Sequence, residues 1–178
     1  DIRDVSLAIG TDKRIGKYFL NAGPGFGGSC FKKDILSLVY ICNYYGLNEV
    51  ANFWEQVILM NDWQQKRITE IIITKLFGTI SNKTIAIFGF AFKKNTNDTR
   101  ESPAINVCKE LLNEGANLLI YDPKVSSSQI TKDLNQQENE SKVFKDEMGA
   151  WRFCGTKEDA CVNADAIVIP VSYTHLRA

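Results

Sequence analysis

Glycines cluster just before a cysteine near the start of the sequence, in the segment Gly23-Pro24-Gly25-Phe26-Gly27-Gly28-Ser29-Cys30-Phe31-Lys32-Lys33-Asp34. Glycine lets the backbone adopt positive φ angles and approach a bound molecule closely. A helix is predicted to begin directly after this loop, and the dipole at a helix N-terminus favours a thiolate at Cys30. Lys32 and Lys33 add positive charge nearby. The pattern predicts that Cys30 is a catalytic nucleophile, and the alternative is a glycine-rich turn with a buried structural cysteine.

The remaining cysteines lie in apolar, periodic surroundings, and we expect them in the core: Cys42, Cys108, Cys154 and Cys161. No two of the five cysteines form a CxxC pair, so neither a zinc site nor a disulfide framework is supported. Reduced thiols favour a cytoplasmic protein. His175 is the single histidine and lies in the last few residues, so a histidine-based triad or metal site is also unsupported.

A second polar segment, residues 89–103, lies between a predicted strand and a predicted helix, where open α/β sheets bind ligands. Lys93 and Arg100 are candidates for phosphate contacts there, together with the amides of the helix N-terminus. The segment is not the G-x-G-x-x-G fingerprint, and the alternative is a solvated polar loop. Asp122 ends the following strand, where it is either a ribose-binding acid or, because Pro123 follows, part of a plain turn.

The elements that position the first segment are predicted to be helical. A short helical stretch, Asp4–Ile9, is closed by Gly10. The next helix starts after Ser29, its expected N-cap, and ends at Gly46. A longer helix from Asn48 to Phe77 would be roughly 45 Å long, so we expect it to connect domains and to pack against a second copy. Its large aromatic residues are expected in a core or at that interface: Phe53, Trp54 and Trp63.

The second half of the chain alternates apolar runs with helical patterns. The strands are predicted at residues 84–90, 117–123, 151–153 and 166–169, and the helices start at Pro103 and span 157–163. Residues 126–147 are expected to be a polar surface excursion. A strand, a helix and a strand within about 40 residues predict a parallel, doubly wound sheet. The predicted fold class is therefore α/β: an all-helical central domain at 1–78 with a long connecting helix, followed by an incomplete Rossmann-like parallel-sheet domain at 82–178.

Composition limits the partners of the protein. Lysine plus arginine and aspartate plus glutamate both number 21, so the net charge gives no case for nucleic acid or an anionic membrane. No apolar run approaches the roughly 20 residues that span a bilayer. The hydrophobic fraction of 44% is large enough for a real core, so global disorder is not expected.

The two polar segments together resemble the UDP-glucose 6-dehydrogenase family. The pattern G-F-G-G-S-C-F-x-K-D occurs at Gly25–Asp34, and G-F-A-F-K-K-x-T-x-D-T-R-E-S occurs at Gly89–Ser102. Met60-Asn61-Asp62 and Ile120-Tyr121-Asp122-Pro123 are also similar to family segments. The resemblance extends from the first residue to about Ile169, and the last residues, 171–178, do not resemble the family.

The resemblance implies an oxidoreductase that converts the C6 alcohol of UDP-glucose to a carboxylate with NAD as cofactor, through a thiohemiacetal and a thioester on Cys30. Asp34 matches a carboxylate that positions water. The residues that match substrate contacts are Arg14, Asn21, Ala22, Gly23, Pro24, Gly25, Phe26, Gly27, Phe92 and Lys93. The residues that match positions near NAD are Cys30, Phe31, Lys32, Lys33 and Arg100. Arg14 matches an arginine that reaches substrate in a neighbouring subunit, which implies a homodimer and possibly a hexamer built as a trimer of dimers.

The family's N-terminal NAD-binding domain has no counterpart in this sequence. We therefore expect that the 178-residue chain alone cannot turn over substrate, although it carries the nucleophile. Two alternatives remain open from the residues: a related enzyme that acts on another nucleotide sugar, such as GDP-mannose, and a non-catalytic oligomerisation module built on the long aromatic-rich helix.

Overall fold

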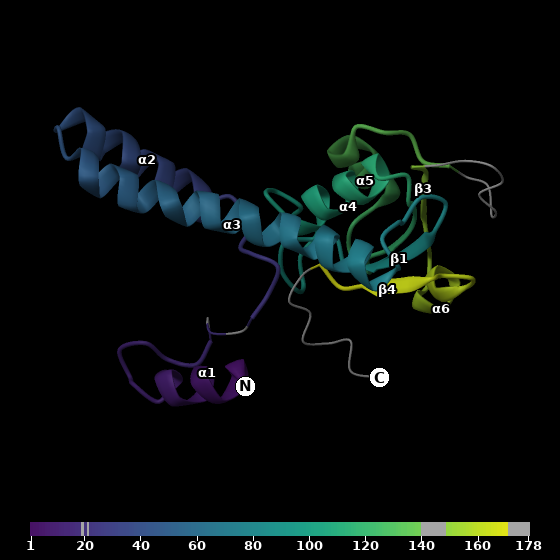
Figure 1. The fold of residues 1–178 in the computed structure, drawn as a ribbon, viewed down its shortest axis with the longest axis horizontal. Helices are drawn as coiled ribbons and strands as arrows, with labels where there is room; N and C mark the ends of the chain where they lie inside the picture. Colours follow the sequence, from purple (N-terminus) through teal and green to yellow (C-terminus); the bar gives the residue numbers. More distant parts are fainter. Residues whose placement is uncertain (19, 21, 140–148, 171–178) are drawn as a thin grey trace.

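The computed structural model describes residues 1–18, 20, 22–139 and 149–170. A helical hairpin projects from a small α/β domain, and one long helix runs from the tip of the hairpin to the face of that domain (Figure 1). The predicted tail at residues 171–178, which includes His175, lies outside the described residues, and so do Asn21 and part of the predicted surface excursion.

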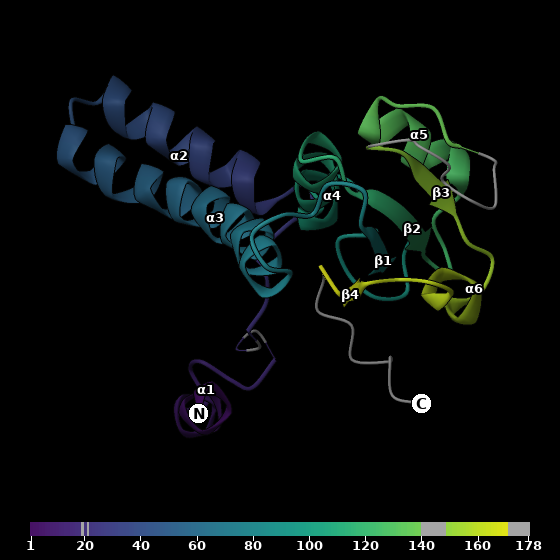
Figure 2. The same cartoon turned by 45° about the vertical axis from the view of Figure 1, so that its right-hand side comes forward.

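The first helix, α1 (Ile2–Gly10), lies apart from the other helices (Figure 2). It starts earlier than the predicted Asp4, because the Asp1 side chain caps it by accepting a hydrogen bond from the amide of Arg3. The segment after α1 folds back on it, and Ser6 Oγ donates to the carbonyl of Leu20 at 2.7 Å. Most apolar side chains of α1 are exposed, so this helix adds little to the core of the chain.

Helices α2 (Phe31–Tyr44) and α3 (Asn48–Lys75) form the hairpin. The predicted end of α2 is confirmed, because Gly46 adopts a φ of 73° and the amide of Leu47 donates to the carbonyl of Cys42 at 2.8 Å. The predicted Ser29 cap is wrong. Cys30 occupies the cap position with φ −93° and ψ −61°, and no side chain caps the helix.

Helix α3 is a single 28-residue helix, which makes it about 42 Å long. It ends two residues before the predicted Phe77, because Phe77 adopts a φ of 67° and the amide of Gly78 donates to the carbonyl of Ile73. Its C-terminal half packs against the main core of the α/β domain through Ile68, Ile72, Ile73 and Leu76. The helix therefore links the hairpin to the sheet without a flexible joint.

The α/β domain is built on a four-stranded sheet in the order β3-β2-β1-β4, and within the described residues its three strand pairs are parallel. The strands are β1 (Thr84–Phe88), β2 (Asn117–Tyr121), β3 (Trp151–Phe153) and β4 (Ala166–Val168). The helices are α4 (Pro103–Asn113), α5 (Ser127–Leu134) and α6 (Lys157–Cys161). The predicted combination of a helical part with a Rossmann-like parallel sheet is confirmed.

Helix α5 lies within the segment 126–147, which was expected to be a polar surface excursion and for which no helix was predicted. Ser126 caps it by accepting from the amide of Gln129, and its apolar residues Ile130 and Leu134 are buried. Four further element ends were predicted too late. Strands β1, β2 and β4 end at Phe88, Tyr121 and Val168, and α6 ends at Cys161, shortly before Asn163 with its φ of 58°.

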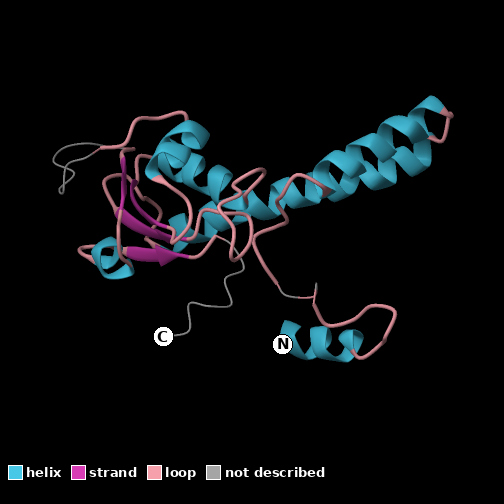
Figure 3. Cartoon of the chain, turned by 180° about the vertical axis from the view of Figure 1, so that it is seen from behind, coloured by secondary structure: helices cyan, strands magenta, loops and turns pink. Residues whose placement is uncertain are grey.

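The core lies between the sheet and helices α3, α4 and α5. The view from behind shows the sheet with helices packed beside it (Figure 3). Buried Cys42, Cys108 and Cys154 confirm the expectation for three cysteines, whereas Cys161 is exposed and not a core residue. The aromatic residues of α3 are not core residues either, since Phe53 and Trp63 are more than half exposed. Across the described ranges, no helix is long and apolar enough to cross a membrane, and no cluster of potential metal ligands occurs.

Candidate active site

Cys30 is exposed at the N-terminus of α2, directly after the glycine loop (residues 23–29). Its carbonyl accepts the Asp34 amide at 2.9 Å, which starts the helix, and Ser29 Oγ lies 3.9 Å from the Cys30 sulfur. The alternative of a buried structural cysteine is therefore wrong. An accessible sulfur at a helix start is the arrangement that a cysteine nucleophile requires.

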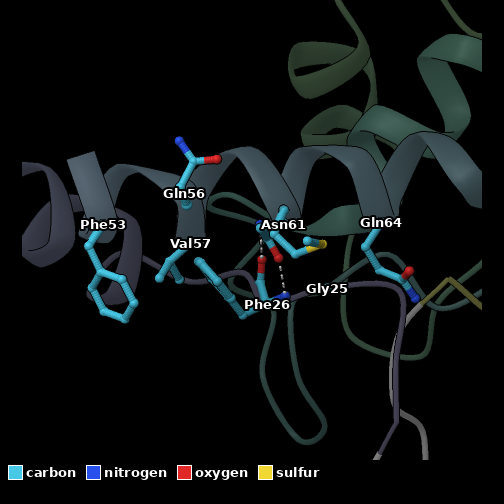
Figure 4. A pocket seen from close by; sticks show the side chains of 8 residues that line it. Gly25, Phe26, Phe53, Gln56, Val57, Asn61 and Gln64 are labelled. Atoms are coloured by element: carbon cyan, nitrogen blue, oxygen red, sulfur yellow. Dashed lines mark hydrogen bonds between the residues drawn. The ribbon is translucent and has the colours of Figure 1, made fainter.

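One side of the glycine loop is pinned to α3 (Figure 4). Asn61 Oδ1 accepts a hydrogen bond from the Phe26 amide at 2.8 Å, and Asn61 Nδ2 donates to the Phe26 carbonyl at 3.2 Å. Gln64 Nε2 donates to the Gly23 carbonyl at 3.2 Å. Gly25 has a φ of 126°, and a Cβ there would lie 2.6 Å from Asn61 Oδ1. Only glycine therefore fits at this position.

An open, apolar pocket of about 420 Å³ lies beside this contact. The Phe26 side chain and the α3 side chains Phe53 and Val57 project toward it in the close-up view (Figure 4). Its lining residues are Gly25, Phe26, Phe53, Gln56, Val57, Met60, Asn61 and Gln64.

The other side of the glycine loop contacts the β1–α4 loop (residues 89–102) of the α/β domain. The amide of Gly28 donates to the carbonyl of Arg100 at 2.9 Å. A Cβ on Gly27 would clash with the Glu101 carbonyl and would lie 2.9 Å from Pro103 Cδ. The two polar segments of the sequence, about 70 residues apart, are thus brought into direct backbone contact at the start of α2.

Charged groups surround Cys30. Lys32 Nζ forms an ion pair with Glu101 at 3.0 Å, and Lys33 lies 3.8 Å from the Asp34 carboxylate. The hydrogen bonds that Arg100 donates to the Asp98 carboxylate, and then the charge of that carboxylate, raise the pKa of Arg100. The same hydrogen bonds lower the pKa of Asp98.

The remaining substrate candidates lie in different places. Phe92 is half-buried against Gly28, and Lys93 is exposed with its Nζ 5.1 Å from the centre of the Phe92 ring. Arg14 is exposed near α1, where it pairs with Asp12, and no recorded contact joins it to Cys30. Asn21 lies outside the described residues. Ala22 is exposed and Pro24 is buried at the start of the glycine loop, and Phe31 packs edge-on against Phe26.

Asp122 does not have the geometry of a ribose-binding acid. It is 3% exposed, and its carboxylate accepts four backbone amide hydrogen bonds. Burial opposes its ionisation, but the amides of Phe90, Lys124 and their neighbours outweigh burial and lower its pKa. The plain-turn alternative is correct, and the carboxylate is directed at the protein backbone.

Sequence reasoning missed the contribution of Asn61 and Glu101 to the site. Asn61 lies in the middle of an amphipathic helix and is 8% exposed, which is unusual for an amide side chain. An amide at a buried position of the helix is the signal that could have indicated its role. Glu101 adopts a φ of 53°, a conformation that a side chain rarely takes and that no local pattern indicates.

Two family models match this chain. The UDP-glucose/GDP-mannose dehydrogenase family, UDP binding domain, matches residues 86–178, and the central domain of the same family matches residues 1–63. Together they include the glycine loop, Cys30 and the β1–α4 loop.

Individual proteins are similar over most of this chain. It is 58% identical over 137 residues, 77% of its length, to UDP-glucose 6-dehydrogenase 4 of Arabidopsis thaliana, and 52% identical over 171 residues, 95% of its length, to UDP-glucose 6-dehydrogenase of Bos taurus. It spans 28% and 34% of those proteins. A UDP-glucose dehydrogenase structure from Pyrobaculum islandicum superposes with a TM-score of 0.77 at 27% identity, over 96% of this chain and 35% of the other.

Proposed function

This chain belongs to the UDP-glucose/GDP-mannose dehydrogenase family, and from that premise we propose that the whole protein oxidises UDP-glucose to UDP-glucuronate. The observation that carries the proposal is the exposed Cys30 at the contact between the glycine loop and the β1–α4 loop. We assign residues 1–78 as the central domain with the nucleophile and 82–178 as the UDP-sugar-binding domain. The NAD-binding domain would belong to the part of the relatives that this chain does not span.

Cys30 has a role that only a covalent nucleophile can fill. The first oxidation turns the C6 alcohol into an aldehyde, and C6 cannot lose a second hydride readily until a group adds to its carbonyl. The Cys30 sulfur adds to C6 and forms a thiohemiacetal. Loss of hydride from C6 then gives a thioester, and water hydrolyses the thioester to release the carboxylate and restore the thiol.

Asp34 and Lys33 stand one turn into α2 from the sulfur. Their side chains are largely exposed and 3.8 Å apart, so both can turn toward a water molecule at C6. We propose that Asp34 orients the hydrolytic water and that Lys33 favours its approach. We propose that the amides at the start of α2 supply positive potential where the C6 oxygen becomes negative.

The residues around Cys30 fit a dinucleotide cofactor. Lys33 and Arg100 are exposed beside the α2 N-terminus. Lys32 also lines a polar pocket of about 330 Å³, in which three lysines outnumber the two carboxylates, Asp62 and Glu110. Cationic and amide donors of this kind suit a pyrophosphate group. NAD⁺, when bound, accepts the hydride in each oxidation. We propose that residues 30–33 and Arg100 hold it next to C6.

The substrate would lie between the two loops. The glycine loop can approach a sugar closely because its backbone carries few side chains, and we propose that residues 21–27 surround the glucose. Phe92 and Lys93 contribute an aromatic face and an exposed positive charge, which suits the nucleotide diphosphate. Arg14 pairs with Asp12 in the segment after α1, which lies apart from the other helices, and we propose that it serves substrate bound in a partner copy.

The exposed aromatic surface of the hairpin supports self-association as a proposal. Phe53 is 66% exposed and Tyr44 75%, values that a large aromatic side chain seldom has in an isolated stable fold. We propose that the hairpin packs against a second copy, as a homodimer that can assemble further into a trimer of dimers. The free thiols favour a cytoplasmic location.

The test replaces Cys30 by serine in the full-length protein. We expect UDP-glucuronate formation to fall by more than about 1,000-fold, because a hydroxyl is a far weaker nucleophile than a thiolate. Cys161→Ser is the matched control, since Cys161 is also exposed but lies on α6, and it should retain activity. Undiminished UDP-glucuronate output from Cys30→Ser would refute the mechanism, and preferential oxidation of GDP-mannose by the wild type would change the substrate.

A further inference from the structure

The β1–α4 loop carries Phe92, Lys93 and Arg100, and both of its ends are held by one segment, residues 122–129, which joins β2 to α5. We propose that Asp122 and Gln129 are positioning residues: Asp122 fixes the substrate-facing end of the β1–α4 loop, and Gln129 fixes its cofactor-facing end. This inference rests on the proposed function, because it assigns different ligands to the two ends of the loop.

Asp122 holds the first end. Its Oδ2 accepts hydrogen bonds from the amides of Phe90 at 2.8 Å and Ala91 at 3.1 Å, immediately before Phe92. Its Oδ1 accepts from the amides of Lys124 at 2.8 Å and Val125 at 3.0 Å. One buried carboxylate therefore joins the exits of β1 and β2, and this fixes the backbone from which the side chains of residues 92 and 93 project.

Gln129 holds the second end. Its Nε2 donates to Thr99 Oγ1 at 3.3 Å and to Asp133 Oδ1 at 2.9 Å, so both amide hydrogens are used and the side chain has one orientation. Thr99 is 4% exposed, and its carbonyl accepts the Ser102 amide at 3.0 Å. Hydrogen bonds thus fix both the side chain and the backbone of Thr99, directly before Arg100.

A displacement of Thr99 would reach Cys30 through the backbone. The Arg100 carbonyl accepts the Gly28 amide, two residues before the sulfur, and the Arg100 side chain is locked by paired contacts to Asp98. The Phe92 amide in turn donates to the Asp98 carbonyl at 3.0 Å, which closes the loop on itself. Asp122 and Gln129 therefore hold the loop at two separate points, one on each side of this closing bond.

The test uses the full-length enzyme and compares the KM for each substrate at saturation of the other. Gln129→Ala should raise the KM for NAD⁺ by about fivefold, the effect of losing one hydrogen bond, and change the KM for UDP-glucose by less than about twofold. Asp122→Asn should instead raise the KM for UDP-glucose and leave the KM for NAD⁺ nearly unchanged, because the end of the loop beside Phe92 and Lys93 loosens. Lys132→Ala, an exposed change on the same helix, is the control and should leave both values unchanged.

A charge exchange separates positioning from general stability. Gln129→Glu places two carboxylates side by side and should raise the KM for NAD⁺, and adding Asp133→Asn restores a donor–acceptor pair and should return the KM toward wild type. Three results would overturn the inference. They are equal rises in both KM values, unchanged KM values in variants that fold, or no return of the KM for NAD⁺ when Asp133→Asn is added.

Failure of the proposed function would show separately, as a wild-type protein that forms no UDP-glucuronate. Amide hydrogen exchange in residues 96–101 then decides the positioning role. Faster exchange there in Gln129→Ala than in Lys132→Ala would support it, and equal exchange would refute it.

Discussion

Asn61 and Phe26, which are 35 residues apart, exchange two hydrogen bonds: the Phe26 amide donates to Asn61 Oδ1, and Asn61 Nδ2 donates to the Phe26 carbonyl. A primary amide is the only neutral side-chain group that presents a donor and an acceptor side by side in this way. The contact fixes the glycine loop on α3 four residues before Cys30. Since the far side of the same loop is bound to Arg100, the nucleophile lies on a strip of backbone held by both halves of the chain.

Replacing Asn61 by aspartate tests this exchange. The acceptor remains, but a carboxylate then faces the Phe26 carbonyl without a donor, in a position that is 8% exposed. We expect the free energy of unfolding to fall by about 2 kcal/mol and kcat/KM to fall with it. Urea denaturation and steady-state assays of the full-length protein measure both. Asn52→Asp makes the same change on the exposed surface of α3, so similar losses in the two variants would contradict the role of Asn61.

Two glycines of the loop differ in the space around them and form a matched pair. Gly27→Ala would place its Cβ against backbone of the β1–α4 loop and should push the two loops apart, at a cost of about 1–3 kcal/mol. Gly23→Ala meets nothing within 4 Å and should change the free energy of unfolding by less than about 0.5 kcal/mol. Chemical denaturation of the full-length variants makes the comparison, and equal destabilisation would show that the loops do not pack as described.

Asp122 makes stability depend on acid pH. Burial opposes its ionisation, yet the four amide donors lower its folded-state pKa below the unfolded value, so the stabilisation is complete above the unfolded pKa near 4 and disappears as the pH falls through the folded pKa. Asp122→Asn loses about two charge-assisted bonds and should cost about 3 kcal/mol at pH 7. The difference from wild type should shrink below about pH 4 in denaturation experiments. A difference that stays constant to pH 2 would contradict this assignment.

Local pattern was enough to predict much of this fold, because strand alternation, helix periodicity and glycine ends are short-range signals. The strand–helix–strand pattern of β1, α4 and β2 predicts the parallel sheet, and α2 ends at Gly46, as a glycine after a helical pattern predicts. Helix α5 was missed although Ser126, Gln129, Ile130 and Leu134 carry a cap and an i, i+4 apolar pair, because polar neighbours dilute that pattern.

The site depended on long-range contacts that one sequence does not reveal. Cys30 was identified from its local surroundings, but its anchoring by Asn61 and Arg100 joins residues that are 35 and about 70 positions apart. The Ser29 cap failed because Cys30 itself adopts helical angles, which a residue-type preference cannot indicate. Apolar spacing also could not distinguish a core face of α3 from an exposed one, and Phe53 is on the exposed side.

Phe53 therefore offers a test of self-association that leaves the monomer intact. It is 66% exposed, so Phe53→Asp should change the free energy of unfolding of the isolated chain by less than about 0.5 kcal/mol. In an interface the new carboxylate would be buried without a partner, and the dissociation constant of the dimer should rise by more than about 100-fold. Sedimentation velocity of the full-length protein over a concentration series measures it. Asn52→Asp adds the same charge one residue earlier and controls for electrostatics. A wild type that stays monomeric at every concentration, or a Phe53→Asp variant that associates like wild type, would remove the hairpin surface as the contact between copies.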